Sequence, residues 1–143
     1  EDISWIMQAV DTCANGLMLC SGSLGAHRQN DVPAIAARFA DRTHFAHLRN
    51  VRKELDGSFE EATHLEGDTD MVALMRTLLV EEARRRDAGR TDHAIPFRPD
   101  HGHEILSDIG RDLVPGYPLI GRMRGLAELR GIASAMAHQY HPS

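Results

Sequence analysis

Apolar residues recur along the chain in two alternating patterns. Some segments place them three or four residues apart, as on one face of a helix, for example Ile3, Ile6 and Val10. Others are short and wholly apolar, such as residues 17–20, which is typical of a buried parallel strand. Helices are expected at residues 3–14, 30–40, 71–86, 104–109 and 121–139. Strands are expected at residues 17–20, 43–48 and 94–97.

Capping and turn residues support these boundaries. Asn15-Gly16 is a stop signal for the first helix, and Asn30-Asp31 can cap the second, with Pro33 in its first turn. Loops are expected at residues 21–25 and 49–70, and a turn at 115–118.

The order of these elements indicates the fold class. Strands that are separated by helices imply right-handed crossovers and a parallel sheet. No linker, low-complexity segment or convincing repeat divides the sequence, so residues 1–143 are expected to form one unit. The fold class is therefore α/β, with about three parallel strands and flanking helices.

Composition excludes several classes of protein. The chain is 42% hydrophobic and 26% charged, as in ordinary globular domains, and its net charge of −5 argues against a nucleic-acid surface. The one basic run, residues 84–86, is interpreted as a solvated helix end. No apolar stretch approaches the length of about 18 residues that spans a bilayer, and no signal peptide is visible. The two cysteines make no disulfide framework, which favours a reducing, cytoplasmic setting.

Polar residues with ligand chemistry follow the apolar strands. Cys20 ends the first strand, His47 lies near the end of the second, and Asp100 and His101 follow the third. In parallel α/β folds, sites form at the carboxyl ends of strands. A thiolate, an imidazole and a carboxylate that converge form a metal-ligand set, so Cys20, His47 and Asp100 are the candidate ligands.

Each of these assignments has an alternative. A lone cysteine after an apolar run is more often simply buried, and Asp100 is also suited to cap the short helix that follows. His44 and His47 are three residues apart and cannot share one face of a strand, and spacing alone does not choose between them. A Cys/His set favours Zn²⁺ by softness, whereas the carboxylate suits Mn²⁺ or Fe²⁺.

Six blocks of the sequence closely resemble the mannonate dehydratases of hexuronate catabolism. They are LCSGSLGA (19–26), HFAHLRNV (44–51), HLEGDTDM (64–71), RPDHGH (98–103), PGY (115–117) and IGRMRGLAELRG (120–131). The blocks occur in the family's order and cover nearly the whole chain. RPDHGH together with GLAELRG is a specific combination.

The resemblance implies a fold and a reaction. The family has a (β/α)₈ barrel similar to xylose-isomerase-like enzymes, and it dehydrates D-mannonate to 2-keto-3-deoxy-D-gluconate with Mn²⁺ or Fe²⁺. Its metal site uses two histidines, a cysteine and an aspartate, and Cys20, His47 and Asp100 match three of them. The remaining family histidine lies on an earlier strand and has no counterpart here.

The resemblance also implies roles for other residues. The family's acid/base pair corresponds to His101 and Tyr117, and which of them acts as acid or base stays open. Arg49, His64 and Arg98 fall in family blocks and are expected to bind the sugar-acid substrate.

Three strands cannot close a barrel, which takes about 250 residues. The chain also begins without Met and runs directly into a helical pattern. We therefore expect residues 1–143 to be the C-terminal portion of a single TIM-barrel catalytic domain, which associates with the rest of the barrel or forms a homo-oligomer. The alternatives are a non-catalytic barrel fragment, or a sugar isomerase or epimerase of the same barrel type.

Overall fold

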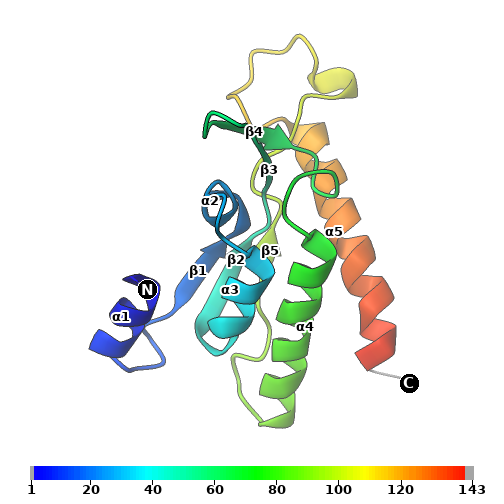
Figure 1. Ribbon diagram of the computed structural model, residues 1–143. Helices are drawn as coiled ribbons and strands as arrows, with labels where there is room; N and C mark the ends of the chain where they lie inside the picture. The colour runs from blue at the N-terminus through cyan, green and yellow to red at the C-terminus, as the bar shows by residue number, and fades with distance from the viewer. Residues whose placement is uncertain (1, 141–143) are drawn as a thin grey trace.

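The computed structural model describes residues 2–140, with side chains through residue 137 (Figure 1). Its centre is a sheet of three parallel strands in the order β1-β2-β5. These strands are β1 (Leu17–Cys20), β2 (Thr43–His47) and β5 (Phe97–Arg98). The α/β class expected from the sequence, a parallel three-stranded sheet with flanking helices, is confirmed.

The described helices are α1 (Asp2–Ala9), α2 (Ser21–Gly25), α3 (Val32–Arg38), α4 (Met71–Asp87) and α5 (Leu119–Tyr140), with two 3₁₀ turns, η1 (Ala40–Arg42) and η2 (Leu106–Asp108). Helices α3, α4 and α5 bury residues against one face of the sheet, whereas α1 has no buried residue. Helix α4 packs between α3 and α5, and α5 runs along its outer side (Figure 1). Among the described helices, none is long and apolar enough to cross a membrane.

The core lies between the sheet and these helices. Its buried residues come from β1, β2, α3, α4 and α5 and from the segments that follow β2 and precede β5: Leu19, Val32, Ala36, Ala46, Leu48, Met71, Leu74, Met75, Leu78, Ile95 and Leu129. Alternation along the strands turns Met18 and Cys20 of β1, and Phe45 and His47 of β2, to the opposite face. That face is less covered in the described part of the chain, where Met18 is 56% exposed.

The predicted helix starts agree with the structure. The carboxylate of Asp31 accepts a hydrogen bond from the Ala34 N–H, and that of Asp70 accepts one from Ala73, so both residues are side-chain caps. A capping carboxylate satisfies a free N–H and also interacts favourably with the positive end of the helix dipole.

Two element boundaries differ from the prediction by three residues or more. Helix α1 ends at Ala9 rather than at residue 14, because the Asn15 amide donates to the carbonyls of Ile6 and Val10 and stops the helix earlier. Strand β5 begins at Phe97 rather than at residue 94. Pro96 has no N–H to donate, and only its carbonyl joins the ladder, accepting from Ala46.

The segment 49–70, expected as a loop, contains an antiparallel hairpin. Strand β3 (Asn50–Lys53) pairs with β4 (Phe59–Ala62), and Gly57 between them has a φ of 95°. Asp56-Gly57 is a hairpin signal, because glycine adopts positive φ without steric cost. Two shorter elements also differ: residues 21–25 form the one-turn helix α2, and the helix expected at 104–109 is only the turn η2.

The interpretation of residues 84–86 as a solvated helix end is wrong for Arg85, which is 1% exposed. Its guanidinium donates to the carboxylate of Glu81 and to the carbonyls of Ala40 and Thr43, both of which precede β2 or begin it. The Arg85 guanidinium is therefore buried, and its hydrogen bonds connect α4 to the start of β2.

Candidate metal and acid–base site

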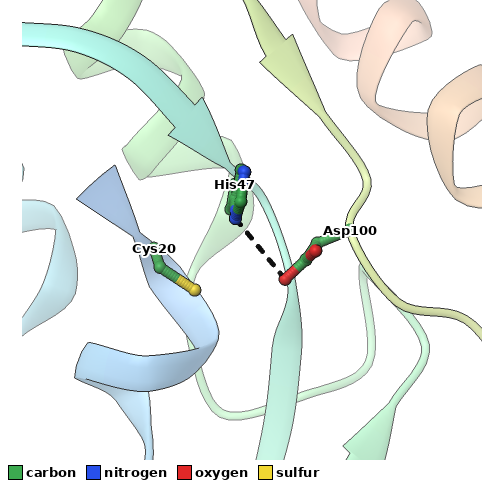
Figure 2. A group of neighbouring side chains, drawn as sticks. All are labelled: Cys20, His47 and Asp100. Carbon is green, nitrogen blue, oxygen red and sulfur yellow. Dashed lines mark ion pairs between the residues drawn. The ribbon is translucent and has the colours of Figure 1, made fainter. Parts of the chain in front are cut away.

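Cys20 and His47 close two neighbouring parallel strands. They are register partners at the last positions of β1 and β2, and they lie on the same face of the sheet. Asp100 follows β5 by two residues. One donor atom from each, a sulfur, a nitrogen and an oxygen, lies within 4.8 Å of the other two. Figure 2 shows the three side chains directed toward one another. The structure thus brings together the three candidate ligands.

The backbone turns sharply to present Asp100. Its φ is 63°, in the left-handed region that aspartate adopts more readily than most residues. Its Oδ1 accepts a hydrogen bond from Arg98 at 3.1 Å, and its Oδ2 lies 3.7 Å from Nδ1 of His47. Asp100 does not cap η2, which begins after Ile105. The alternative role of Asp100 as a helix cap is therefore wrong.

His47 and His44 have different surroundings. The ring of His44 lies with Nε2 2.9 Å from the Cys13 carbonyl, away from the strand ends, whereas His47 faces Asp100. Burial lowers the pKa of His47, an effect that the nearby Asp100 only partly opposes. The imidazole is therefore neutral at neutral pH, which is the form that binds a metal.

Two serines of α2 hold the strand ends in place. The hydroxyl oxygen of Ser21 lies 3.1 Å from the His47 carbonyl oxygen and 2.5 Å from the Arg49 carbonyl oxygen, and its single hydrogen can be donated to either. The hydroxyl of Ser23 donates to Sγ of Cys20 at 3.2 Å.

This donor set fits a divalent metal ion. A thiolate, a neutral imidazole and a carboxylate on converging strand ends are ligands of first-row transition metals. Three protein donors leave further positions for another ligand, water or substrate.

His101 and Tyr117 are also brought together, beside the donor set. Nε2 of His101 lies 3.2 Å from the Tyr117 hydroxyl, and the ring centroids are 4.8 Å apart. The turn before Tyr117 contains Gly116, with a φ of 83°, whose carbonyl accepts from the Gly102 N–H at 3.1 Å. This backbone bond joins the segment after β5 to the turn that carries the tyrosine.

The three residues expected to bind substrate have different environments. Arg49 is largely covered and forms an ion pair with Glu61, and Arg98 is partly exposed beside Asp100. His64 is only 3% exposed, with Nε2 2.9 Å from the Pro99 carbonyl. It contacts the backbone just before Asp100, so its observed contact supports that segment. A direct substrate contact of these three side chains stays a prediction.

Glu61 is a site residue that sequence reasoning missed. Its carboxylate binds both Arg49 and His101. It lies on β4, in the segment expected to be a loop. The Asp56-Gly57 turn signal could have revealed the hairpin, and alternation along β4 would then have set Glu61 apart from exposed Glu60.

Comparison with known proteins identifies the family. The family model described as D-mannonate dehydratase (UxuA) matches residues 1–143. The chain belongs to this family. The resemblance seen in the sequence blocks is thereby confirmed.

Individual relatives agree with the family match. The chain is 59% identical over 141 residues to the mannonate dehydratase of Rhizobium meliloti (strain 1021), covering 96% of this chain and 35% of that protein. It is 53% identical over 137 residues to the mannonate dehydratase of Saccharophagus degradans (strain 2-40), covering 95% of this chain and 34% of that protein. The chain thus spans about a third of the length of these relatives.

A solved structure shares the fold. The crystal structure of mannonate dehydratase from Streptococcus suis serotype 2 superposes with a TM-score of 0.80 at 30% sequence identity. The match covers 96% of this chain and 37% of that chain. The arrangement of strands and helices described above is therefore that of a portion of a mannonate dehydratase.

Proposed function

We propose that this chain supplies part of the active site of a metal-dependent mannonate dehydratase, which converts D-mannonate to 2-keto-3-deoxy-D-gluconate. One observation carries the proposal: in a chain of this family, Cys20, His47 and Asp100 form a donor set, and His101, the residue after Asp100, lies 3.2 Å from the Tyr117 hydroxyl. The chain would be the C-terminal portion of a single (β/α)₈ barrel, whose earlier part supplies the fourth ligand.

Cys20, His47 and Asp100 would hold the ion, either Mn²⁺ or Fe²⁺. When bound, the ion supplies Lewis-acid stabilisation of the charge that develops at the substrate carboxylate, a contribution of several kcal/mol. Zn²⁺ is the expected competitor because a thiolate and an imidazole are soft enough to hold it.

His101 and Tyr117 would move the protons. The reaction removes the proton alpha to the carboxylate and expels the beta hydroxyl, which leaves with a proton as water. The enol that results becomes the 2-keto acid. One member of the pair would take the alpha proton, and the other would protonate the departing hydroxyl. Each such transfer contributes roughly 10²–10⁴-fold to the rate.

Arg49 and Arg98 would orient the anionic substrate. Both cations lie next to residues of the site, Arg49 beside Glu61 and Arg98 beside Asp100. A guanidinium recognises a carboxylate through paired hydrogen bonds. His64 would act from behind the site by holding the Pro99 backbone. Cytoplasmic location and association with a second copy or with the rest of the barrel belong to the same proposal.

The test is a chimera in which residues 1–143 replace the matching segment of the Rhizobium meliloti relative. The purified chimera, supplied with Mn²⁺ or Fe²⁺, is expected to convert D-mannonate to the 2-keto acid. An Asp100→Asn variant is expected to lose both the bound metal and this activity.

Two results would contradict the proposal. A chimera that folds and binds metal like the parent relative, but does not dehydrate mannonate while the parent does, would remove the dehydratase assignment. Conversion of a sugar or sugar acid without loss of water would favour an isomerase or epimerase instead.

A further inference from the structure

Glu61 binds two residues of the site at once. Its Oε2 accepts from Nε of Arg49 at 3.0 Å, and its Oε1 lies 2.7 Å from Nδ1 of His101 and also pairs with Nη2 of Arg49. Both carboxylate oxygens are therefore engaged. The side chain is 25% exposed, so these bonds are only partly screened by water.

The bond to Glu61 determines how the His101 ring is presented. A carboxylate accepts but does not donate, so the hydrogen must lie on Nδ1 of His101. The ring then directs Nε2 toward the Tyr117 hydroxyl, 3.2 Å away. Without Glu61, either nitrogen could carry the hydrogen, and the ring could turn about its χ2 angle.

Arg49 keeps Glu61 in its ionised form. Burial raises the pKa of Glu61, but the hydrogen bonds from Arg49 and His101 outweigh it, and the pKa is lowered overall. The Arg49 side chain is itself confined, because it lies against Gly22, where any Cβ would collide with its methylenes. Its guanidinium also lies 5.6 Å from the ring centroid of Phe59.

The hairpin makes the position of Glu61 rigid. Glu61 pairs with the fully buried Val51 of β3, so its backbone belongs to a sheet rather than to a mobile loop. In addition, Nε2 of His103 lies 3.0 Å from the Glu61 carbonyl. One residue of β4 thus contacts the segment after β5 at two points, His101 and His103.

We propose that Glu61 is a positioning residue for His101, and that the β3–β4 hairpin serves to deliver it. Glu61 holds Nδ1, so that Nε2 of His101 faces Tyr117 and, under the proposed function, stays free to exchange a proton. This inference rests on the proposed function only for its effect on turnover, because the orientation of the ring is a separate observable.

The experiment compares Glu61→Gln, Glu61→Ala and Glu61→Asp in the chimera. Glu60→Gln is the matched control, because Glu60 is the preceding residue, lies at the surface and pairs with Arg52 rather than with the site. We expect Glu61→Gln and Glu61→Ala to lower kcat by about 10²-fold, at the lower end of what an acid–base group contributes, with bound metal nearly unchanged. KM is expected to change as well, because Arg49 loses its ion-pair partner. Glu61→Asp should recover part of kcat, and Glu60→Gln should match the unsubstituted chimera.

The second readout is the ring of His101 itself. In the zinc-loaded, diamagnetic chimera with ¹⁵N-labelled histidine, the signals of His101 are identified by their loss in His101→Ala. We expect the Nδ1–H pattern in the unsubstituted chimera and a shift toward the Nε2–H pattern in Glu61→Ala.

The two readouts separate the hypotheses. An inactive chimera that still shows the Glu61-dependent ring pattern would overturn the proposed function and support the positioning role. Unchanged His101 signals in Glu61→Ala would overturn the positioning role, whether kcat falls or not. A kcat of Glu61→Ala close to that of Glu60→Gln would also overturn it.

Discussion

Two histidines on one strand show that the face of the strand on which a residue lies determines whether it can be a metal ligand. His44 and His47 are both on β2, but only His47 lies on the same face as Cys20, because side chains alternate along a strand. His44 contacts the Cys13 carbonyl instead. The two residues therefore form a matched pair for testing the metal site.

We predict that His47→Ala in the chimera weakens Mn²⁺ binding by at least about 10²-fold, since loss of an outer-shell partner alone costs 10–100-fold. His44→Ala should bind Mn²⁺ as the unsubstituted chimera does. Metal titration followed by elemental analysis of the dialysed protein measures both. Equal binding by the two variants would mean that His47 is not a ligand.

A second residue-level prediction separates proton transfer from ligation. His101→Ala and Tyr117→Phe should lower kcat by about 10²–10⁴-fold while the metal content stays that of the unsubstituted chimera. The measurement is kcat beside bound metal in the same preparation. If His101→Ala instead loses the metal, and turnover returns when metal is added in excess, His101 supports the ion rather than the chemistry.

The order of strands in the sequence was sufficient to predict that Cys20, Asp100 and one histidine of the second strand lie together, because the carboxyl ends of parallel strands meet at one edge of a sheet. The choice of His47 over His44 came from the resemblance to the family, and the structure agrees with it. The sequence was not sufficient to predict that Glu61 belongs to the site, because that follows from its contacts with residues that are distant in the sequence. Its partners Arg49 and His101 are 12 and 40 residues away in the sequence. No local pattern records such contacts.

At the scale of the elements, α4 contains a buried ion pair between Arg85 and Glu81 that the pattern of charges in the sequence did not indicate. Arg85 belongs to a run of three arginines, yet it is enclosed and donates to Glu81, Ala40 and Thr43. A charge in such a position needs all its partners, because an unpaired buried charge is costly. The same residue thus links α4 to the strand that carries His47.

We predict that Arg85→Ala lowers the free energy of unfolding by about 3–5 kcal/mol, because it removes the buried partner of the Glu81 carboxylate and leaves the carbonyls of Ala40, Thr43 and Asp92 without this donor. Arg84→Ala is the control, since Arg84 also binds Glu81 but is more than half exposed, and it should have a much smaller effect. Urea unfolding of the two chimera variants, followed by circular dichroism, provides the comparison. Equal unfolding midpoints would contradict a structural role for the buried pair.

The types of the main secondary-structure elements were easier to predict from the sequence than the residues at which the elements begin and end. Caps at Asp31 and Asp70 and the apolar strands are local signals, and the structure agrees with them. The end of α1 and the start of β5 depended on side-chain and ladder bonds formed at a distance, by Asn15 and Pro96. The hairpin was missed because its strands, β3 and β4, lack the apolar run that identified the central sheet.

At the scale of the whole molecule, the described part of the chain leaves both edges and one face of its central sheet incompletely covered. Strands β1 and β5 each pair with β2 alone in the described residues, so each has one edge without a strand partner. Met18 lies on the face that the core helices do not cover. Helix α1 adds Trp5, which is 72% exposed, and the half-exposed Ile6, and the half-exposed Val10 follows the helix. Free strand edges and apolar patches of this kind promote association.

We therefore predict that residues 1–143, expressed alone, form an assembled or aggregated state rather than a monomer, and do not dehydrate mannonate. The free strand edges and the apolar face favour association, and only three protein donors would hold the ion, so it would bind more weakly. Light scattering gives the size, and an assay of mannonate dehydration with added Mn²⁺ gives the activity, with the chimera as the positive control in the same buffer. A well-behaved monomer with turnover near that of the chimera would show that no further strands or ligands are needed. In that case residues 1–143 would not be one part of a larger barrel.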